Sequence, residues 1–98
     1  MDVNDLHDAT LERIELLWEQ KICRCYVRTM SEGVSRTILL EFSGITGMSI
    51  PCQEPWGPSV SILEMKQEGS RYTIAMQSGD LITVDAGGLC LDKLQGCP

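Results

Sequence analysis

The sequence predicts an all-β domain, mainly antiparallel, folded as a sandwich or partly open barrel of six to eight strands. Two observations favour this fold class. Short runs alternate apolar with polar side chains, which is the period of a half-buried strand. Glycine-containing turns separate these runs, as at 67–70 and 78–80, so that neighbouring strands can form hairpins. A chain of 98 residues allows a single domain, 1–98, which should bury roughly 65% of the unfolded surface.

The first element, Thr10 to Trp18, fits two structures. Its helix-forming residues favour a helix over 5–19, which would make the fold α+β. In that helix one stripe would hold Leu6, Thr10, Ile14 and Leu17. In a strand, one face would hold Thr10, Glu12, Ile14, Leu16 and Trp18. The short link Glu19-Gln20-Lys21 to the next strand suits a hairpin, although it contains no glycine.

The rest of the first half predicts a three-strand meander. Ile22–Arg28 is β-rich and places Cys23, Cys25 and Val27 on one face. After a turn region at 30–35, Arg36–Phe42 points three apolar residues inward: Ile38, Leu40 and Phe42. Ser43–Ser49 contains Gly44 and Gly47, which weaken a regular ladder, so we expect a short bent strand or a bulged continuation.

A proline-rich loop, Pro51–Pro58, follows and carries Trp56. Each proline fixes its own φ and makes the preceding residue extended, so the segment cannot be helical. We expect a rigid loop that crosses between the two halves of the domain. Trp56 then has two interpretations, as a plug over one end of the sandwich or as an anchor for a partner.

Three strands are predicted in the second half: Val60–Lys66, Tyr72–Gln77 and Leu81–Ala86. In the second of them, Tyr72, Ile74 and Met76 alternate with polar or small residues, as in a half-exposed strand. Ile82, Val84 and Ala86 share one face of the third. After Gly87-Gly88, the segment Leu89–Leu91 is a candidate edge strand.

Charge and composition make some functions improbable. A net charge of −6 argues against nucleic acid and anionic membranes, whose recognition needs a basic surface. It favours a protein partner with basic character. The N-terminus is acidic and no apolar run approaches the roughly 18 residues of a membrane span, so we expect a cytoplasmic protein. Residues 1–20 carry six acidic residues against Arg13, whereas 21–36 are mostly basic, which predicts cross-strand ion pairs.

The cysteines and the single histidine are the candidates for chemistry. Five cysteines are an odd number, and no export signal is present, so we expect reduced thiols. Cys23-x-Cys25 could supply half a zinc site, but the other cysteines lack paired spacing, so no metal or cofactor is predicted. For His7-Asp8 we favour a structural role: Asp8 anchors a turn and His7 bonds to backbone. The alternative is a small-ligand or metal-dependent enzyme that uses both.

Short motifs spread over most of the chain carry a resemblance. They are Leu-His-Asp-Ala-x-Leu-x-x-Ile at 6–14, Trp18, Pro-Trp-Gly-Pro-Ser-x-Ser-Ile at 55–62 and Gln-Ser-Gly-Asp at 77–80. In these the chain resembles small bacterial domains of unknown function with a His-Asp-Ala motif, some of them similar to immunity proteins of polymorphic toxin systems. The resemblance implies a strand and a hairpin after the motif, so we predict a strand at Thr10–Trp18. The positions that match are His7, Asp8, Trp56, Gly57 and Ser59.

These observations lead to a functional expectation. We expect a non-enzymatic protein-binding module, immunity-like in the sense of that resemblance, with an acidic surface and a tryptophan-bearing loop. Binding should involve His7, Asp8, Trp56, Gly57 and Ser59, and no catalytic residue is assigned. A further alternative is a structural homodimer that pairs an exposed sheet edge.

Overall fold

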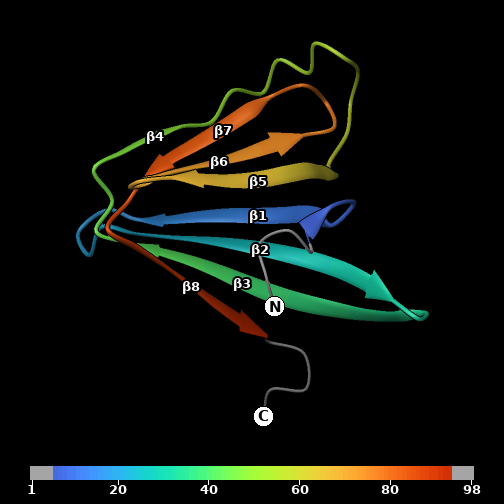
Figure 1. Cartoon of the computed structure of the whole chain (residues 1–98), viewed down its shortest axis with the longest axis horizontal. Coiled ribbons are helices and arrows are strands. Elements are labelled where there is room, and N and C mark those ends of the chain that lie inside the picture. Colours follow the sequence, from blue (N-terminus) through green and yellow to red (C-terminus); the bar gives the residue numbers. More distant parts are fainter. Residues whose placement is uncertain (1–5, 94–98) are drawn as a thin grey trace.

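A computed structural model describes residues 6–93 and shows an all-β chain. Eight strands form two antiparallel four-stranded sheets, in the orders β1-β2-β3-β8 and β4-β7-β6-β5 (Figure 1). The strands are β1 (Thr10–Leu17), β2 (Ile22–Ser31), β3 (Val34–Ser43), β4 (Gly47–Ser49), β5 (Ile62–Glu68), β6 (Arg71–Met76), β7 (Leu81–Asp85) and β8 (Gly88–Lys93). The predicted all-β class is confirmed, and the alternative helix over 5–19 is wrong because β1 occupies its centre.

Two continuous pieces of chain pass from one sheet to the other at the left end of Figure 1. Strand β3 leads into β4 through Gly44, and β7 leads into β8 through Gly87. The two bends contact each other, since the Gly87 amide donates to the Ser43 carbonyl at 2.8 Å. Gly44 adopts φ +65°, and a Cβ there would lie 3.3 Å from the Gly87 nitrogen. Glycine therefore allows the two chains to turn this corner side by side.

At the other end the two sheets approach each other through β1 and β5. Thr10 forms an isolated antiparallel bridge with Ser61. Beside it, the Leu11 amide donates to the Val60 carbonyl at 2.8 Å. The bridge joins only the first residues of β1 to the segment before β5, so the sheets are not closed into a barrel. The architecture is consistent with the predicted sandwich.

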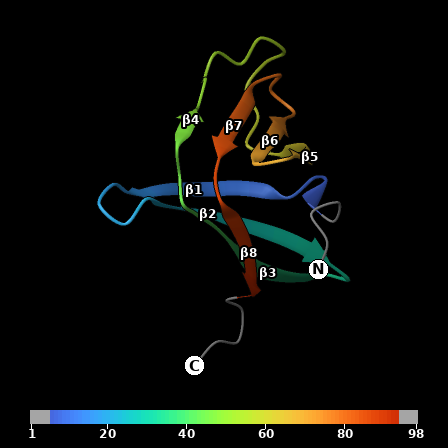
Figure 2. The same ribbon diagram turned by 60° about the vertical axis from the view of Figure 1, so that its left-hand side comes forward.

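The proline-rich loop was expected to cross between the two halves of the domain, but it does not. It connects β4 to β5, which are the two edge strands of one sheet. The prediction is wrong because β4 pairs with β7, with Met48 opposite Val84, and so already belongs to the second sheet. The crossing occurs earlier in the chain, between β3 and β4. Figure 2 shows β4 rising beside β7 before the chain enters the loop.

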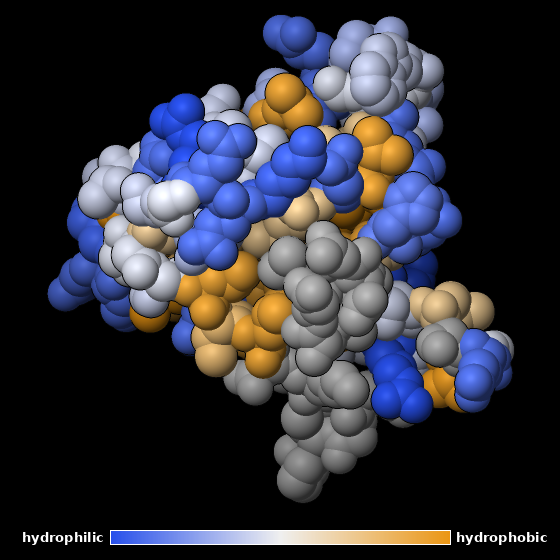
Figure 3. Space-filling model, viewed as in Figure 1, coloured by the Kyte–Doolittle hydropathy of each residue, from blue (hydrophilic) through white to orange (hydrophobic). Residues whose placement is uncertain are grey.

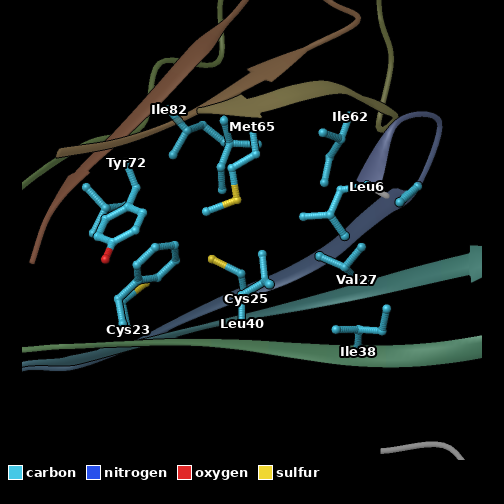
Figure 4. Packing of buried hydrophobic residues seen from close by; sticks show 14 of the residues in the cluster. Leu6, Cys23, Cys25, Val27, Ile38, Leu40, Ile62, Met65, Tyr72 and Ile82 are labelled. Carbon is cyan, nitrogen blue, oxygen red and sulfur yellow. The ribbon is translucent and has the colours of Figure 1, made fainter. Parts of the chain in front are cut away.

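The core lies between the sheets and is built by the alternating residues that the sequence identified (Figure 4). From the first sheet it contains Cys23, Cys25, Val27, Ile38, Leu40 and Phe42, and from the second Ile62, Met65, Tyr72, Ile74, Met76, Ile82 and Val84. The rings of Phe42 and Tyr72 meet edge to face with centroids 5.2 Å apart. Leu6, from the turn before β1, is fully buried as well. This burial of apolar area supplies the main driving force for folding.

Strand β1 departs from the predicted alternation. A β-bulge between Leu11 and Arg13 shifts the register, so that Leu11 and Ile14 share the inner face. Glu12 and Trp18 are therefore not part of an inward row, and Trp18 is 74% exposed beside the following turn. In that turn Lys21 adopts φ +57°, the left-handed conformation for which the link contains no glycine.

The predicted ion pairs cover the outer face of the first sheet. Arg28 lies 3.3 Å from Glu12, which joins β2 to β1. Arg24 lies 3.8 Å from Glu15 on β1 and 2.8 Å from Glu41 on β3. The acidic first segment and the basic second segment are thus strand neighbours, as expected. Asp2 and Asp5 of the acidic segment lie outside the described residues, as does Cys97.

Among residues 6–93 the structure contains no helix with the length and apolar character needed to cross a membrane.

Candidate functional site

A single carboxylate fixes the start of the Trp56 loop, which we define as residues 50–61. Asp80 accepts hydrogen bonds from the backbone amides of Gln53, at 2.9 Å, and Glu54, at 3.0 Å. The Ser78 hydroxyl donates to the same carboxylate at 2.8 Å. Asp80 and Ser78 are only 7% and 2% exposed. The turn between β6 and β7 therefore holds the loop through charge-assisted hydrogen bonds, which are stronger than neutral ones.

The environment of Asp80 favours its ionised form. Burial by itself raises the pKa of this carboxyl group, since it disfavours the charged state. The hydrogen bonds from Ser78, Gln53 and Glu54 outweigh that effect and hold the pKa of Asp80 below its usual range. The carboxylate is thus negatively charged whenever the loop is in place at neutral pH.

Trp56 lies on the surface of this rigid loop. Its backbone amide donates to the Ser78 carbonyl at 2.9 Å. Beneath it, a Cβ on Gly79 would lie 2.8 Å from both Pro55 Cγ and Trp56 Cδ2, so only glycine allows the contact. The side chain is nevertheless 71% exposed. The interpretation of Trp56 as a plug over the sandwich is therefore wrong, because the proline-rich chain carries the ring above the turn instead of between the sheets.

Gly57 and Ser59 shape the loop after the tryptophan. Gly57 adopts φ +111°, and its amide donates to the Glu54 carbonyl at 3.0 Å. The Ser59 amide lies 3.3 Å from the Glu54 carboxylate, and its hydroxyl accepts from the Ser61 amide at 3.1 Å. Both residues thus make contacts that order the loop and bring it back to β5.

His7 and Asp8 form a turn that packs against the second sheet. Nδ1 of His7 lies 2.6 Å from the Leu63 carbonyl and, because a carbonyl only accepts, carries the proton. Asp8 adopts φ +67° and accepts from the Gln77 side chain at 2.5 Å. Nε2 of His7 is 3.5 Å from the Asp8 carboxylate. The predicted structural role is confirmed: Asp8 anchors a turn and His7 bonds to backbone.

Two of the five predicted site residues, Asp8 and Trp56, bond to one turn, Gln77–Asp80. The Gln77 side chain holds Asp8, and the Ser78 carbonyl holds Trp56. The His7–Asp8 turn, the β6–β7 turn and the descending arm of the Trp56 loop all lie at the right end of Figure 1. Gln77 and Asp80 are structural partners that the sequence analysis did not assign, because Ser78-Gly79-Asp80 has the composition of an ordinary hairpin turn.

A hollow of about 410 Å³ opens beside the His7–Asp8 turn. It is lined by His7, Asp8, Ala9, Thr10, Arg28, Thr29, Met30 and Ser35. Its one guanidinium, that of Arg28, is already paired with Glu12 at 3.3 Å. Within residues 6–93, no three histidine, cysteine or acidic side chains converge as metal ligands.

Cys23 and Cys25 are fully buried between the sheets, and both are free thiols. The hydrogen bond with Cys23 and burial both raise the pKa of the Cys25 thiol. A protonated thiol without solvent access is a poor nucleophile and a poor metal ligand. This pair acts as small hydrophobic residues of the core.

Several large apolar side chains are exposed besides Trp56. Two belong to the same region, Val60 in the loop, 61% exposed, and Leu81 at the start of β7, 55% exposed. The space-filling view in Figure 3 shows apolar surface in separate groups among polar residues. Val60 and Leu81 were missed by the sequence analysis, which treated both as ordinary strand residues.

Comparisons of the chain with protein-family models, curated proteins and solved structures found no match. The resemblance to His-Asp-Ala domains stays a prediction based on the quoted motifs.

Proposed function

We propose that this protein is a non-enzymatic protein-binding module whose contact surface is centred on Trp56. The observation that carries the proposal is a 71% exposed tryptophan on a loop that Asp80 and Gly79 hold in place. Tryptophan is enriched among the residues that dominate interface energies. A loop that is already ordered loses little conformational entropy on binding, which favours affinity.

The surroundings of Trp56 indicate the kind of partner. Val60 and Leu81 add exposed apolar surface to the same end of the molecule. A partner should therefore offer an apolar pocket for the indole. The net charge of −6 favours a basic partner, because opposite charges accelerate association. An immunity-like role, in which an acidic protein binds a basic toxin, is the form of this function that the resemblance implies.

Ion pairing limits the part played by the acidic surface. On the first sheet, Glu12 and Glu15 already face Arg28 and Arg24. Their charges act on a partner at a distance more than through direct contact. The loop residues, with Trp56 first, are the expected source of affinity.

The test compares two exposed tryptophans at opposite ends of the molecule. Tagged wild-type protein, Trp56→Ala and Trp18→Ala are used to capture partners from the native cell, after circular dichroism has shown all three to be folded. Trp18 is the matched control because it is 74% exposed and lies in the β1–β2 turn. The captured protein is then purified and its dissociation constant measured for each variant.

We expect Trp56→Ala to raise the dissociation constant by about thirtyfold or more, the effect of losing roughly 2 kcal/mol at a central anchor. Trp18→Ala should bind like the wild type. Equal binding by all three proteins, or a loss confined to Trp18→Ala, would show that the Trp56 loop is not the contact surface.

A further inference from the structure

Strand β1 leaves one of its sides unpaired. Among the strands that the structure describes, it lies at the edge of its sheet and pairs with β2. Thr10 and Leu11 are covered by Ser61 and Val60, but within residues 6–93 no strand pairs with the outer edge over residues 12–17. An edge with free backbone N–H and C=O groups is a template for a further strand. We propose that a second copy of this chain pairs with β1 in antiparallel orientation, about a two-fold axis at Ile14.

The charges of β1 are complementary to themselves in this register. Arg13 and Glu15 project from the same face, where their side chains are 2.6 Å apart. With Ile14 opposite Ile14 of the second copy, Arg13 of each chain lies opposite Glu15 of the other. The two-fold axis repeats this favourable pair, and opposite charges at facing positions stabilise antiparallel strands. The sequence Arg13-Ile14-Glu15 thus fits its own copy.

Apolar surface beside the same edge favours pairing as well. Ile14 is half-buried and, with Leu11, lines a hollow of about 180 Å³ under the Trp56 loop. Leu16, two residues further along, is 45% exposed and lines a second hollow of about 310 Å³. In the proposed register Ile14 meets Ile14 of the second copy, and Leu16 lies diagonally beside it. Both side chains would lose exposure on pairing, which is favourable.

A comparison with strand β5 shows why we propose β1 as the edge that pairs with a second copy. It is also an edge strand, and Glu64-Met65-Lys66 has the same kind of charge symmetry. Its central residue, Met65, is only 3% exposed, so pairing would bury no further apolar side chain there. Lysine on an edge strand also opposes association. Lys66→Glu is therefore a matched control for substitutions in β1.

The contact is short, so association should be weak and depend on concentration. Sedimentation velocity from low micromolar to near-millimolar concentration measures the dimer dissociation constant of the wild type, Arg13→Glu, Glu15→Arg and Lys66→Glu. Circular dichroism first shows that each variant is folded. We expect the wild type and Lys66→Glu to dimerise equally. Each β1 variant alone should associate at least tenfold more weakly, because like charges then face each other twice.

The decisive sample is an equimolar mixture of Arg13→Glu and Glu15→Arg. One chain then presents two acidic residues and the other two basic residues, so a heterodimer should form although neither variant dimerises alone. A wild type that is monomeric throughout the range would overturn the proposal. So would a β1 variant that dimerises like the wild type, a mixture without heterodimer, or a loss of the dimer in Lys66→Glu. The substitutions lie in β1 and β5 and the measurement is self-association, so the outcome is independent of the proposed function.

Discussion

Asp80 fixes the start of the candidate binding loop. Its carboxylate accepts bonds from Gln53, Glu54 and Ser78, and these contacts place Trp56 over Gly79. None of these partners is adjacent to Asp80 in the sequence, and two of them, Gln53 and Glu54, belong to the Trp56 loop itself. The function proposed for Trp56 therefore depends on the ionisation of Asp80, a residue that is only 7% exposed.

Replacement of Asp80 by asparagine should lower the free energy of unfolding and should make that energy less dependent on pH. Because the native pKa of Asp80 is below its unfolded value, the unfolded state binds more protons in the range between the two. The stabilisation is complete above the ordinary aspartate pKa, about 3.9, and is lost as the pH falls through the native value. Asp80→Asn should unfold at lower urea concentration than the wild type at neutral pH. The difference between the two urea midpoints should be smaller at about pH 3.

Urea midpoints of both proteins at the two pH values make this measurement. The ion pair of Asp85 with Arg71, which also lowers the pKa of Asp85, is present in both proteins and cancels in the comparison. A difference that stays constant with pH would contradict the role given to the Asp80 charge.

At the scale of elements, the corner between the sheets depends on two bends in close contact. Gly44 combines φ +65° with a backbone neighbour, Gly87, that leaves little room for a side chain. Gly33, in the β2–β3 turn, has a similar φ of +77° but open space around it. Substituting each of the two glycines separates the cost of the left-handed conformation from the cost of the close contact with Gly87.

Gly33→Ala should destabilise by about 1–2 kcal/mol, the strain of a left-handed conformation. Gly44→Ala should destabilise by more, because its Cβ also lies 3.3 Å from the Gly87 nitrogen. Chemical denaturation of the two variants gives both values. Equal destabilisation would mean that the Gly87 backbone moves away from a Cβ on Gly44 at no cost in free energy.

At the scale of the whole molecule, a large side chain from outside the strands adds to the core. Leu6 precedes β1 and is fully buried near Ile62 and Val27 (Figure 4). The turn that holds it is bonded to the second sheet, since the Asp8 amide donates to the Ile62 carbonyl at 2.8 Å. This residue therefore contributes to the packing between the two sheets.

Leu6→Ala should lower the free energy of unfolding by about 2–5 kcal/mol, the usual result of removing a buried leucine side chain. Leu81→Ala, at a position that is 55% exposed, is the control and should change it by no more than about 0.5 kcal/mol. Thermal and urea unfolding measure both. A loss below about 1 kcal/mol for Leu6→Ala would show that the first turn opens independently of the core.

The sequence by itself determined most of the secondary structure and the inward faces of four strands. Alternation in β2, β3, β6 and β7 predicted which residues are buried, because a side-chain period of two leaves one choice once the core side is known. The opposite charges of the first two segments predicted their ion pairs. The bond of His7 to backbone and the turn at Asp8 were also predicted.

Only the tertiary structure decided how these elements combine. The pairing of β8 with β3 and of β4 with β7 depends on a corner formed by residues far apart in the chain, Gly44 and Gly87. The bulge in β1 arises where Thr10 and Leu11 must also bond to the segment before β5. Trp56 is exposed because Asp80 and Gly79, from another turn, hold its loop above the sheet. Such contacts are non-local, so no pattern within one segment could reveal them.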